Sequence, residues 1–164
     1  MLLDLIVPLV PAISLFLAIT LQEISLPVAG WSVFRPDIVL ICLFYWRLYR
    51  PDRCSGTLPF FFGLIVDILS GVPTGLNAIS KTVLVILVGY FGQRLRATDF
   101  IYLLPIISIF VFIEESIQVM MMFLIGMTQI HWSLFFGRIV ATTLVAPLVI
   151  SLLIYIHRSW LEEM

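Results

Sequence analysis

Hydrophobic residues gather into six runs along the chain, and each run is bounded by polar residues or by glycine and proline. A helix needs roughly 20 mainly apolar residues to cross the hydrocarbon core of a bilayer. The runs predict membrane helices at about residues 5–25, 37–49, 57–70, 77–93, 100–125 and 132–157. The second and third runs are shorter than a full span, which a small tilt or a locally thinner bilayer would accommodate.

The segments between the runs are short, and the longest extends from about Glu23 to Pro36. The chain has no internal repeat, run of charges or low-complexity linker. The first run, Leu5–Leu21, is longer than the apolar core of a typical signal peptide and follows a start without Lys or Arg, so we expect a retained helix. We therefore predict a single transmembrane domain over residues 1–164, built as an all-α bundle of six helices.

Composition places this chain in lipid rather than in water. Hydrophobic residues make up 62% of the 164 residues, charged residues make up 12%, and the mean hydropathy is +1.15. Soluble domains contain about 45–50% apolar and about 25% charged residues. The composition excludes a soluble enzyme and a disordered regulator. The net charge of −1 leaves no basic field for nucleic acid.

The basic residues of the loops predict the orientation of the helices. One set of loops and helix ends holds Arg47, Arg50, Arg53, Arg94, Arg96 and Arg158. The other set holds only Arg35 outside the predicted spans. Cytoplasmic loops are enriched in Lys and Arg, so we predict that the first set and both termini are cytoplasmic in a multi-pass inner-membrane protein.

Aromatic residues near the predicted helix ends fit the same orientation, since Trp and Tyr collect at membrane interfaces. We expect Trp31 and Trp132 at the outer ends of helices. We expect Tyr45, Trp46, Tyr49 and Trp160 at the inner ends.

Five charged residues lie at least three positions from the ends of the predicted spans: Asp67, Lys81, Glu114, Glu115 and Arg138. A charge at the bilayer centre costs about 2.5–3.5 kcal/mol on insertion scales, so each needs a partner or a purpose. Asp67 and Lys81 lie ~5 Å and ~6 Å from the outer ends of consecutive helices, which predicts an ion pair between them. Three roles are open for these charges. They hold helices together, they form a proton or ligand pathway, or they contact another membrane protein.

The two adjacent glutamates cannot share one partner, because consecutive helix positions differ by about 100° in direction. One of them is expected to point into the bundle, and burial would favour the protonated form of the other. The long side chain of Arg138 is within reach of one glutamate, although their depths differ by ~8 Å.

Recognisable catalytic and metal-binding patterns are missing from the sequence. His131 and His157 have no second ligand at helical spacing, and Cys42 and Cys54 are not part of a Cys-x-x-Cys motif, so we expect free thiols. Metalloprotease, serine-hydrolase and phosphate-loop motifs do not occur. We therefore expect a protein that is not an enzyme and needs no metal or cofactor.

The second to fourth predicted helices carry a recognisable series of residues. Phe34–Asp37 contains Arg-Pro before an apolar segment, Ile38–Trp46, that ends in Tyr-Trp. Gly63–Gly71 then reads Gly-x-x-x-Asp-x-x-Ser-Gly, and Thr74–Leu76 contains a further glycine. The series resembles the rod shape-determining protein MreD family over about Phe34–Leu87. The residues that carry the resemblance are Arg35, Pro36, Asp37, Gly63, Asp67, Gly71 and Gly75.

The resemblance implies an inner-membrane scaffold of the bacterial cell-elongation machinery that maintains rod shape and is not an enzyme. Its implied partners are MreC, a single-span protein with a periplasmic domain, and, directly or indirectly, MreB, RodA and penicillin-binding protein 2. Such a scaffold couples MreB to lateral-wall peptidoglycan synthesis, contacts membrane lipid and binds no nucleic acid. The resemblance also implies a fold similar to the substrate-binding membrane subunits of energy-coupling-factor vitamin transporters.

The motif residues also have local physical roles. We expect Pro36 at the first position of a helix, where its missing N–H is not needed, and Asp37 in the first turn, where its charge suits the helix dipole. Gly63 leaves a small face for another helix to approach. Gly71 and Gly75 are suited to a turn with positive φ.

Three hypotheses about function remain open at this point. The first is the scaffold. The alternative is the substrate-binding membrane subunit of a vitamin transporter. The third is an intramembrane hydrolase that uses Asp67 or the Glu114–Glu115 pair.

Overall fold

The computed structural model describes residues 10–24, 35–52, 54, 56–96, 100–127 and 131–161, with only the backbone described at 100, 101 and 158–161. These residues form six α-helices: α2 (Val10–Glu23), α3 (Ile38–Tyr49), α4 (Thr57–Ser70), α5 (Leu76–Arg96), α6 (Phe100–Leu124) and α7 (Trp132–Leu161). No strand occurs in the described ranges. The predicted all-α class is confirmed, while residues 5–9 and 25 of the first predicted helix lie outside the described residues.

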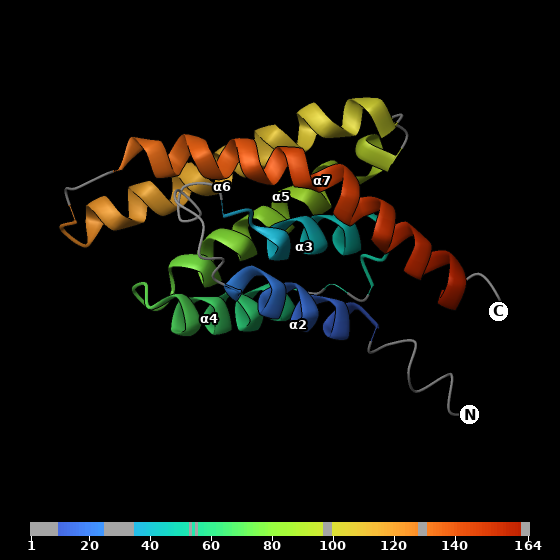
Figure 1. Cartoon of the computed structure of the whole chain (residues 1–164), viewed down its shortest axis with the longest axis horizontal. Coiled ribbons are helices and arrows are strands. Elements are labelled where there is room, and N and C mark those ends of the chain that lie inside the picture. Colours follow the sequence, from blue (N-terminus) through green and yellow to red (C-terminus); the bar gives the residue numbers. More distant parts are fainter. Residues whose placement is uncertain are drawn as a thin grey trace.

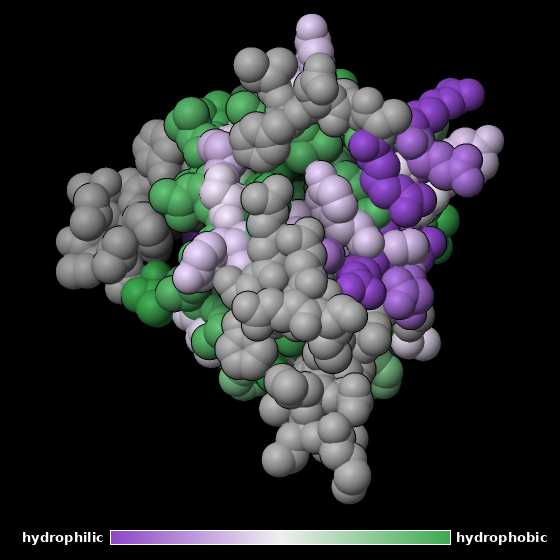
Figure 2. Space-filling model, turned by 90° about the vertical axis from the view of Figure 1, so that its right-hand side faces the viewer, coloured by the Kyte–Doolittle hydropathy of each residue, from purple (hydrophilic) through white to green (hydrophobic). Residues whose placement is uncertain are grey.

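Successive helices run in opposite directions along the long axis of the molecule (Figure 1). The ends of α3, α5 and α7 therefore lie at one end of the bundle, together with the start of α2. This end carries the exposed side chains of Asp52, Arg94 and Arg96. Figure 2 looks onto it and shows hydrophilic residues gathered on the right-hand side and hydrophobic residues mainly at the left and top.

α3 is the central helix of the bundle. It packs against α2, α5 and α7, and most of its residues are buried. With 12 residues it is only ~18 Å long. Because protein rather than lipid surrounds α3, its apolar positions occupy the whole circumference instead of a single stripe.

Two aromatic residues expected at the inner interface lie in the core instead. Trp46 is 0% exposed and Tyr45 is 3% exposed, so this part of the interfacial prediction is wrong. The Trp46 indole Nε1 donates to Ser14 Oγ of α2 at 2.7 Å, and its ring stacks on His157 of α7. Neighbouring helices therefore cover the end of α3. Trp132, by contrast, is exposed, whereas Trp31 and the Trp160 side chain lie outside the described residues.

Among the described residues, three helical stretches are long and apolar enough to cross a membrane: Leu76–Arg96, Tyr102–Leu124 and Trp132–His157. The apolar helices α2, α3 and α4 have 14, 12 and 14 residues. Large hydrophobic side chains cover the outer surface of the bundle, among them Phe16, Phe61, Ile86, Phe112 and Leu148. Exposed apolar surface on several helices suits a lipid solvent, as the composition indicates.

The glycines of the motif allow α4 and α5 to pack closely. A Cβ atom at Gly63 would lie 2.6 Å from the Ala78 backbone nitrogen and 2.7 Å from the Asn77 carbonyl oxygen. Gly71 ends α4 with a φ of 65°, and Gly75 precedes α5 with a φ of 103°. The predicted small helix face and the predicted positive φ values are both confirmed.

Candidate functional site

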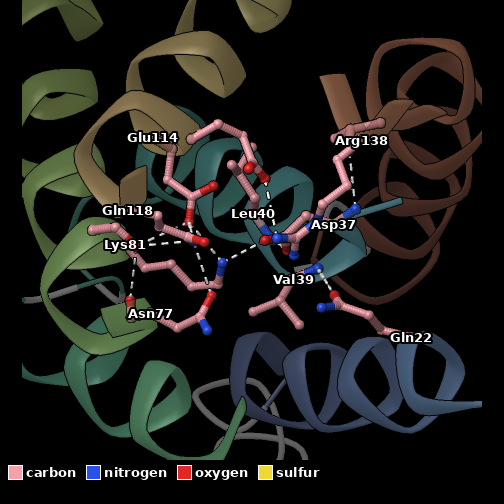
Figure 3. A network of polar contacts seen from close by, with 12 residues as sticks. Gln22, Asp37, Val39, Leu40, Asn77, Lys81, Glu114, Gln118 and Arg138 are labelled. Atoms are coloured by element: carbon pink, nitrogen blue, oxygen red, sulfur yellow. Dashed lines mark hydrogen bonds and ion pairs between the residues drawn. The ribbon is translucent and has the colours of Figure 1, made fainter. Parts of the chain in front are cut away.

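A buried ion cluster lies at the centre of the bundle (Figure 3). The Lys81 ammonium of α5 donates to Asp37 Oδ2 at 2.5 Å and to Glu114 Oε1 of α6 at 2.9 Å. These three side chains are at most 1% exposed. Charges removed from solvent in this way must be compensated by one another and by hydrogen bonds.

Asp37 is held in this cluster because it is the N-cap of α3. Its Oδ1 atom accepts from the Leu40 backbone N–H at 2.8 Å, and its own backbone N–H donates to Thr142 Oγ1 of α7 at 2.9 Å. The expectation of Pro36 at the first helical position and Asp37 within the first turn is therefore wrong by two positions, because α3 begins at Ile38. A capping aspartate leaves one carboxylate oxygen for Lys81.

Glu114 extends the cluster along α5 and α6. Its Oε1 atom accepts from Ser80 Oγ at 3.0 Å and from Gln118 Nε2 at 2.8 Å, in addition to Lys81. Gln118 Nε2 also lies 3.1 Å from Asn77 Oδ1, to which it donates. Gln118, one helical turn after Glu114, was missed by the sequence analysis, although this spacing is a signal for a shared helix face.

Asp67 does not pair with Lys81, so the predicted ion pair is wrong. The Asp67 carboxylate accepts from the backbone N–H groups of Gly75 and Asn77, each at 2.8 Å, and of Ala78 at 3.4 Å. It thereby satisfies the first N–H groups of α5, whose positive dipole end favours a carboxylate. Equal depth along two helices does not fix the direction in which a side chain points, and the nearest donors belong to the turn.

Asp67 is still linked to the ion cluster by hydrogen bonds through Asn77 and Gln118. The Asn77 side-chain amide donates to Asp67 Oδ1 at 2.9 Å and accepts from Gln118. The polar network from Asp67 to Thr142 thus joins α4, α5, α6, α3 and α7.

The two adjacent glutamates have different partners, as predicted. Glu114 faces Lys81, whereas Glu115 Oε1 lies 3.3 Å from Arg138 Nη1 of α7. Both glutamates are buried, with 0% and 5% exposure. The reach of the arginine side chain therefore overcomes the difference in depth estimated from helix rise.

A further polar group of residues ties α2 to the bundle near the α4–α5 turn. Arg35 forms an ion pair with Glu23 and donates from Nε to the Gln22 carbonyl oxygen at 2.8 Å. Ser70 Oγ donates to Glu23 Oε1 at 3.0 Å. Gln22 and Glu23 were not among the predicted site residues, although two adjacent polar residues at the end of an apolar run are a usable signal.

A cavity of about 320 Å³ lies beside the network, between α2, α5, α6 and α7. Val72 of the α4–α5 turn and His131, just before α7, line it, so it lies at the end of the bundle opposite the last turn of α5 (Figure 1). Its polar lining comprises Gln22, Arg35, Ser70, Asn77, Glu115, Gln118, His131 and Arg138. Its apolar lining comprises Val72, Leu76, Val119, Met122, Leu134 and Phe135. Such walls can hold a segment that offers both hydrogen-bonding and apolar groups.

The two cysteines are free thiols, as expected, and both are buried. Cys42 lies within α3. Cys54 lies in the connection between α3 and α4, where Arg47 Nη1 donates to its carbonyl oxygen at 3.2 Å.

Comparison with known proteins gives the family. The family model described as rod shape-determining protein MreD matches residues 4–158. A Haemophilus influenzae protein named rod shape-determining protein MreD is 27% identical over 149 residues, which cover 90% of this chain and 90% of that protein. No solved structure matches the chain, so the implied similarity to energy-coupling-factor subunits has no support. Since the family match extends over nearly the whole sequence, this chain belongs to the rod shape-determining protein MreD family.

Proposed function

We propose that this protein is an inner-membrane scaffold of the bacterial cell-elongation machinery that binds MreC. Through MreC it couples MreB to lateral-wall peptidoglycan synthesis by RodA and penicillin-binding protein 2. The family supports the role in rod-shape determination. The observation that carries the binding role is the cavity of about 320 Å³ beside the buried polar network.

The network supports a scaffold rather than a catalyst. The carboxylates of Asp67 and Glu114 are 0% exposed and are bound by groups of the protein itself. Their contacts link helices, which fixes the walls of the cavity before a partner arrives. A preformed site loses little conformational freedom on binding.

The position of the cavity suits a single-span partner that continues into a periplasmic domain. On the orientation predicted from the arginines, the α4–α5 turn and the start of α7 face the periplasm. A partner span would lie against the exposed apolar helices, and its membrane-proximal segment would reach the cavity. We therefore propose a contact that begins on the lipid-facing surface and ends in this cavity.

The orientation is part of the proposal and has its own test. Six membrane-crossing helices with both termini in the cytoplasm would give cytoplasmic readouts for reporter fusions after Arg53, Arg96 and Met164. The common end of α3, α5 and α7 in Figure 1 supports this arrangement. A periplasmic readout at Met164 would contradict it.

Binding is tested by co-purification of tagged protein with MreC in mild detergent. Val119 lines the cavity, whereas its neighbour Met120 is 57% exposed and is not part of the lining. Val119→Trp is expected to lower MreC recovery at unchanged membrane level, and Met120→Trp serves as the matched control. Equal recovery of MreC with both variants would show that the cavity is not part of the contact with MreC. A vitamin that co-purifies in place of MreC would overturn the scaffold role.

The cellular role is tested by deletion in a rod-shaped host. Loss of the protein is expected to give round, widening cells, which the wild-type gene restores and the Val119→Trp variant restores poorly. Normal rods after clean deletion would contradict the proposed function.

A further inference from the structure

A second cavity, of about 360 Å³, lies between α5 and α6 on the outer surface of the bundle. Its lining on α5 is Leu87, Phe91, Arg94 and Leu95, and its lining on α6 is Ile106, Ile109, Phe110 and Ile113. These positions follow helical spacing, so each helix contributes one continuous face. We call this cavity the α5–α6 groove, and Arg94 is the single charged residue of its lining.

We propose that the α5–α6 groove binds one acyl chain of an anionic phospholipid whose phosphate is held by Arg94. Leu95 and Phe110 are buried beneath the groove, with 8% and 6% exposure. Ile109 is 58% exposed on its rim. The groove is therefore a depression in an apolar surface and not simply a smooth lipid-facing wall.

The depth of the groove matches a phospholipid. Arg94 lies in the last turn of α5, and Leu87 lies seven residues, ~10 Å, farther from that end. The neighbouring tyrosines Tyr90 and Tyr102 are 83% and 60% exposed, as is typical of rings at a membrane interface. A lipid with its phosphate at Arg94 would thus extend its chain towards the bilayer centre along the groove.

A lipid fits the groove better than a helix of another protein. Close helix packing in membranes favours Gly, Ala, Ser and Thr at the contact, and none of the eight lining residues is of these types. Basic groups between membrane helices are known to favour anionic head groups.

The inference is independent of the proposed function and is tested on the full chain by native mass spectrometry. Purified protein is exposed to equal amounts of phosphatidylglycerol and phosphatidylcholine with identical acyl chains. We expect preferential retention of phosphatidylglycerol. Arg94→Gln should lower that retention about fivefold, which corresponds to ~1 kcal/mol per basic residue near an anionic surface. Arg94→Lys should retain most of it.

Arg96→Gln is the matched control. It removes the same charge at the same helix end, but Arg96 is not part of the groove lining, and its Nε donates to the Gly92 carbonyl oxygen at 3.3 Å. We expect little change in lipid retention. Equal losses of phosphatidylglycerol retention in Arg94→Gln and Arg96→Gln would show that only the general surface charge matters, which would overturn the proposal. Equal retention of the two lipids by the wild type would overturn it as well.

The apolar part of the site is tested by filling it. Ile109→Trp is expected to lower retention of both lipids, whereas Leu148→Trp, at a 72% exposed position on α7, should not. Thermal unfolding of each variant shows that the protein is folded. Unchanged retention in folded Ile109→Trp protein would overturn the groove as the binding site, and displacement of lipid by MreC would assign the groove to a protein partner instead.

Discussion

Lys81 and Asp37 lie 44 positions apart in the chain and form an ion pair that is almost completely closed to solvent. The Asp37 side chain also caps α3, and Lys81 has a second carboxylate partner in Glu114. The desolvation of such charges is expensive, so the pair contributes little net stability compared with an apolar pair. Removal of one member, however, leaves the other uncompensated.

Lys81→Met should therefore be strongly destabilising. It leaves Asp37 and Glu114 buried without their shared cation, which typically costs about 3–5 kcal/mol. The expected result is a large loss of protein from the membrane fraction and a lower midpoint in detergent-induced unfolding. Leu148→Met, an apolar change at an exposed position of α7, is the control and should remain at the wild-type level.

Removal of the negative charge of Asp37 should restore part of the stability that the Lys81→Met protein loses. Asn is as good a helix cap as Asp, so Asp37→Asn keeps α3 capped while it removes one buried negative charge. The double variant Lys81→Met with Asp37→Asn is expected to be more stable than Lys81→Met alone in the same unfolding measurement. Strictly additive losses would contradict the coupling between these two residues.

Gly63 and Gly89 should respond differently to alanine. At Gly63 the new Cβ meets backbone atoms of Asn77 and Ala78, so α4 and α5 must separate, with an expected loss of about 3 kcal/mol. At Gly89 the new Cβ lies 2.7 Å from Arg47 Nε, and a flexible side chain can move. Gly89→Ala should therefore cost about 1 kcal/mol. Equal unfolding midpoints for the two variants would contradict the close approach of α4 and α5.

Asp67 should behave as a helix cap and not as a partner of Lys81. Asp67→Asn keeps one acceptor for the N–H groups of α5 but loses the charge at the helix start, which should cost about 1–2 kcal/mol. Exchange of the two charges, Asp67→Lys with Lys81→Asp, should be worse than either single change, because both sites lose their partners. If the exchanged protein reached the wild-type level in the membrane, that result would support the ion pair between Asp67 and Lys81 that the sequence predicted.

The Cys54 thiol should react slowly in the native protein. Burial raises its pKa to about 11, and the nearby Arg47 offsets only part of this effect. Since the thiolate is the reactive form, alkylation at pH 8 should be about a hundredfold slower than at an exposed cysteine. The folded pKa lies above the unfolded one, so the contribution of the thiol to stability is present below about pH 9 and is lost as the pH rises towards 11.

The measurement uses Cys42→Ala protein, in which Cys54 is the remaining cysteine. Alkylation is followed at pH 8 with and without denaturant. Denaturant should restore the ordinary rate. Fast alkylation of the native protein would show that the connection between α3 and α4 is open.

The helices could be predicted well from sequence because their signal is local. Apolar runs gave six segments that agree with the observed helices to within a few residues at the described boundaries. Gly63, Gly71 and Gly75 could also be interpreted, since their roles depend on backbone geometry nearby. Burial was harder to predict, because Trp46 looks the same in sequence whether α2 and α7 or lipid covers it.

The polar network could be predicted only in part. Asp67, Lys81 and Glu114 were singled out because a charge within an apolar run is conspicuous, and Arg138 was expected to reach one of the two adjacent glutamates. The partners of Lys81 and Asp67 were not predicted, because depth along a helix gives no direction around it. Asp37 was assigned to the first turn of a helix and not to the cluster, since nothing in the sequence shows that α3 is central.

The place of α3 bears on how the protein is made. The ribosome completes this short helix early, yet α5 and α7 supply two of its walls, and Thr142 of α7 accepts the backbone N–H of its cap. α3 is ~18 Å long, which is shorter than a hydrocarbon core of about 30 Å. A nascent chain that stops after α6 therefore lacks the helix that covers one side of α3. Synthesis must therefore reach α7 before α3 can be packed on all of its sides.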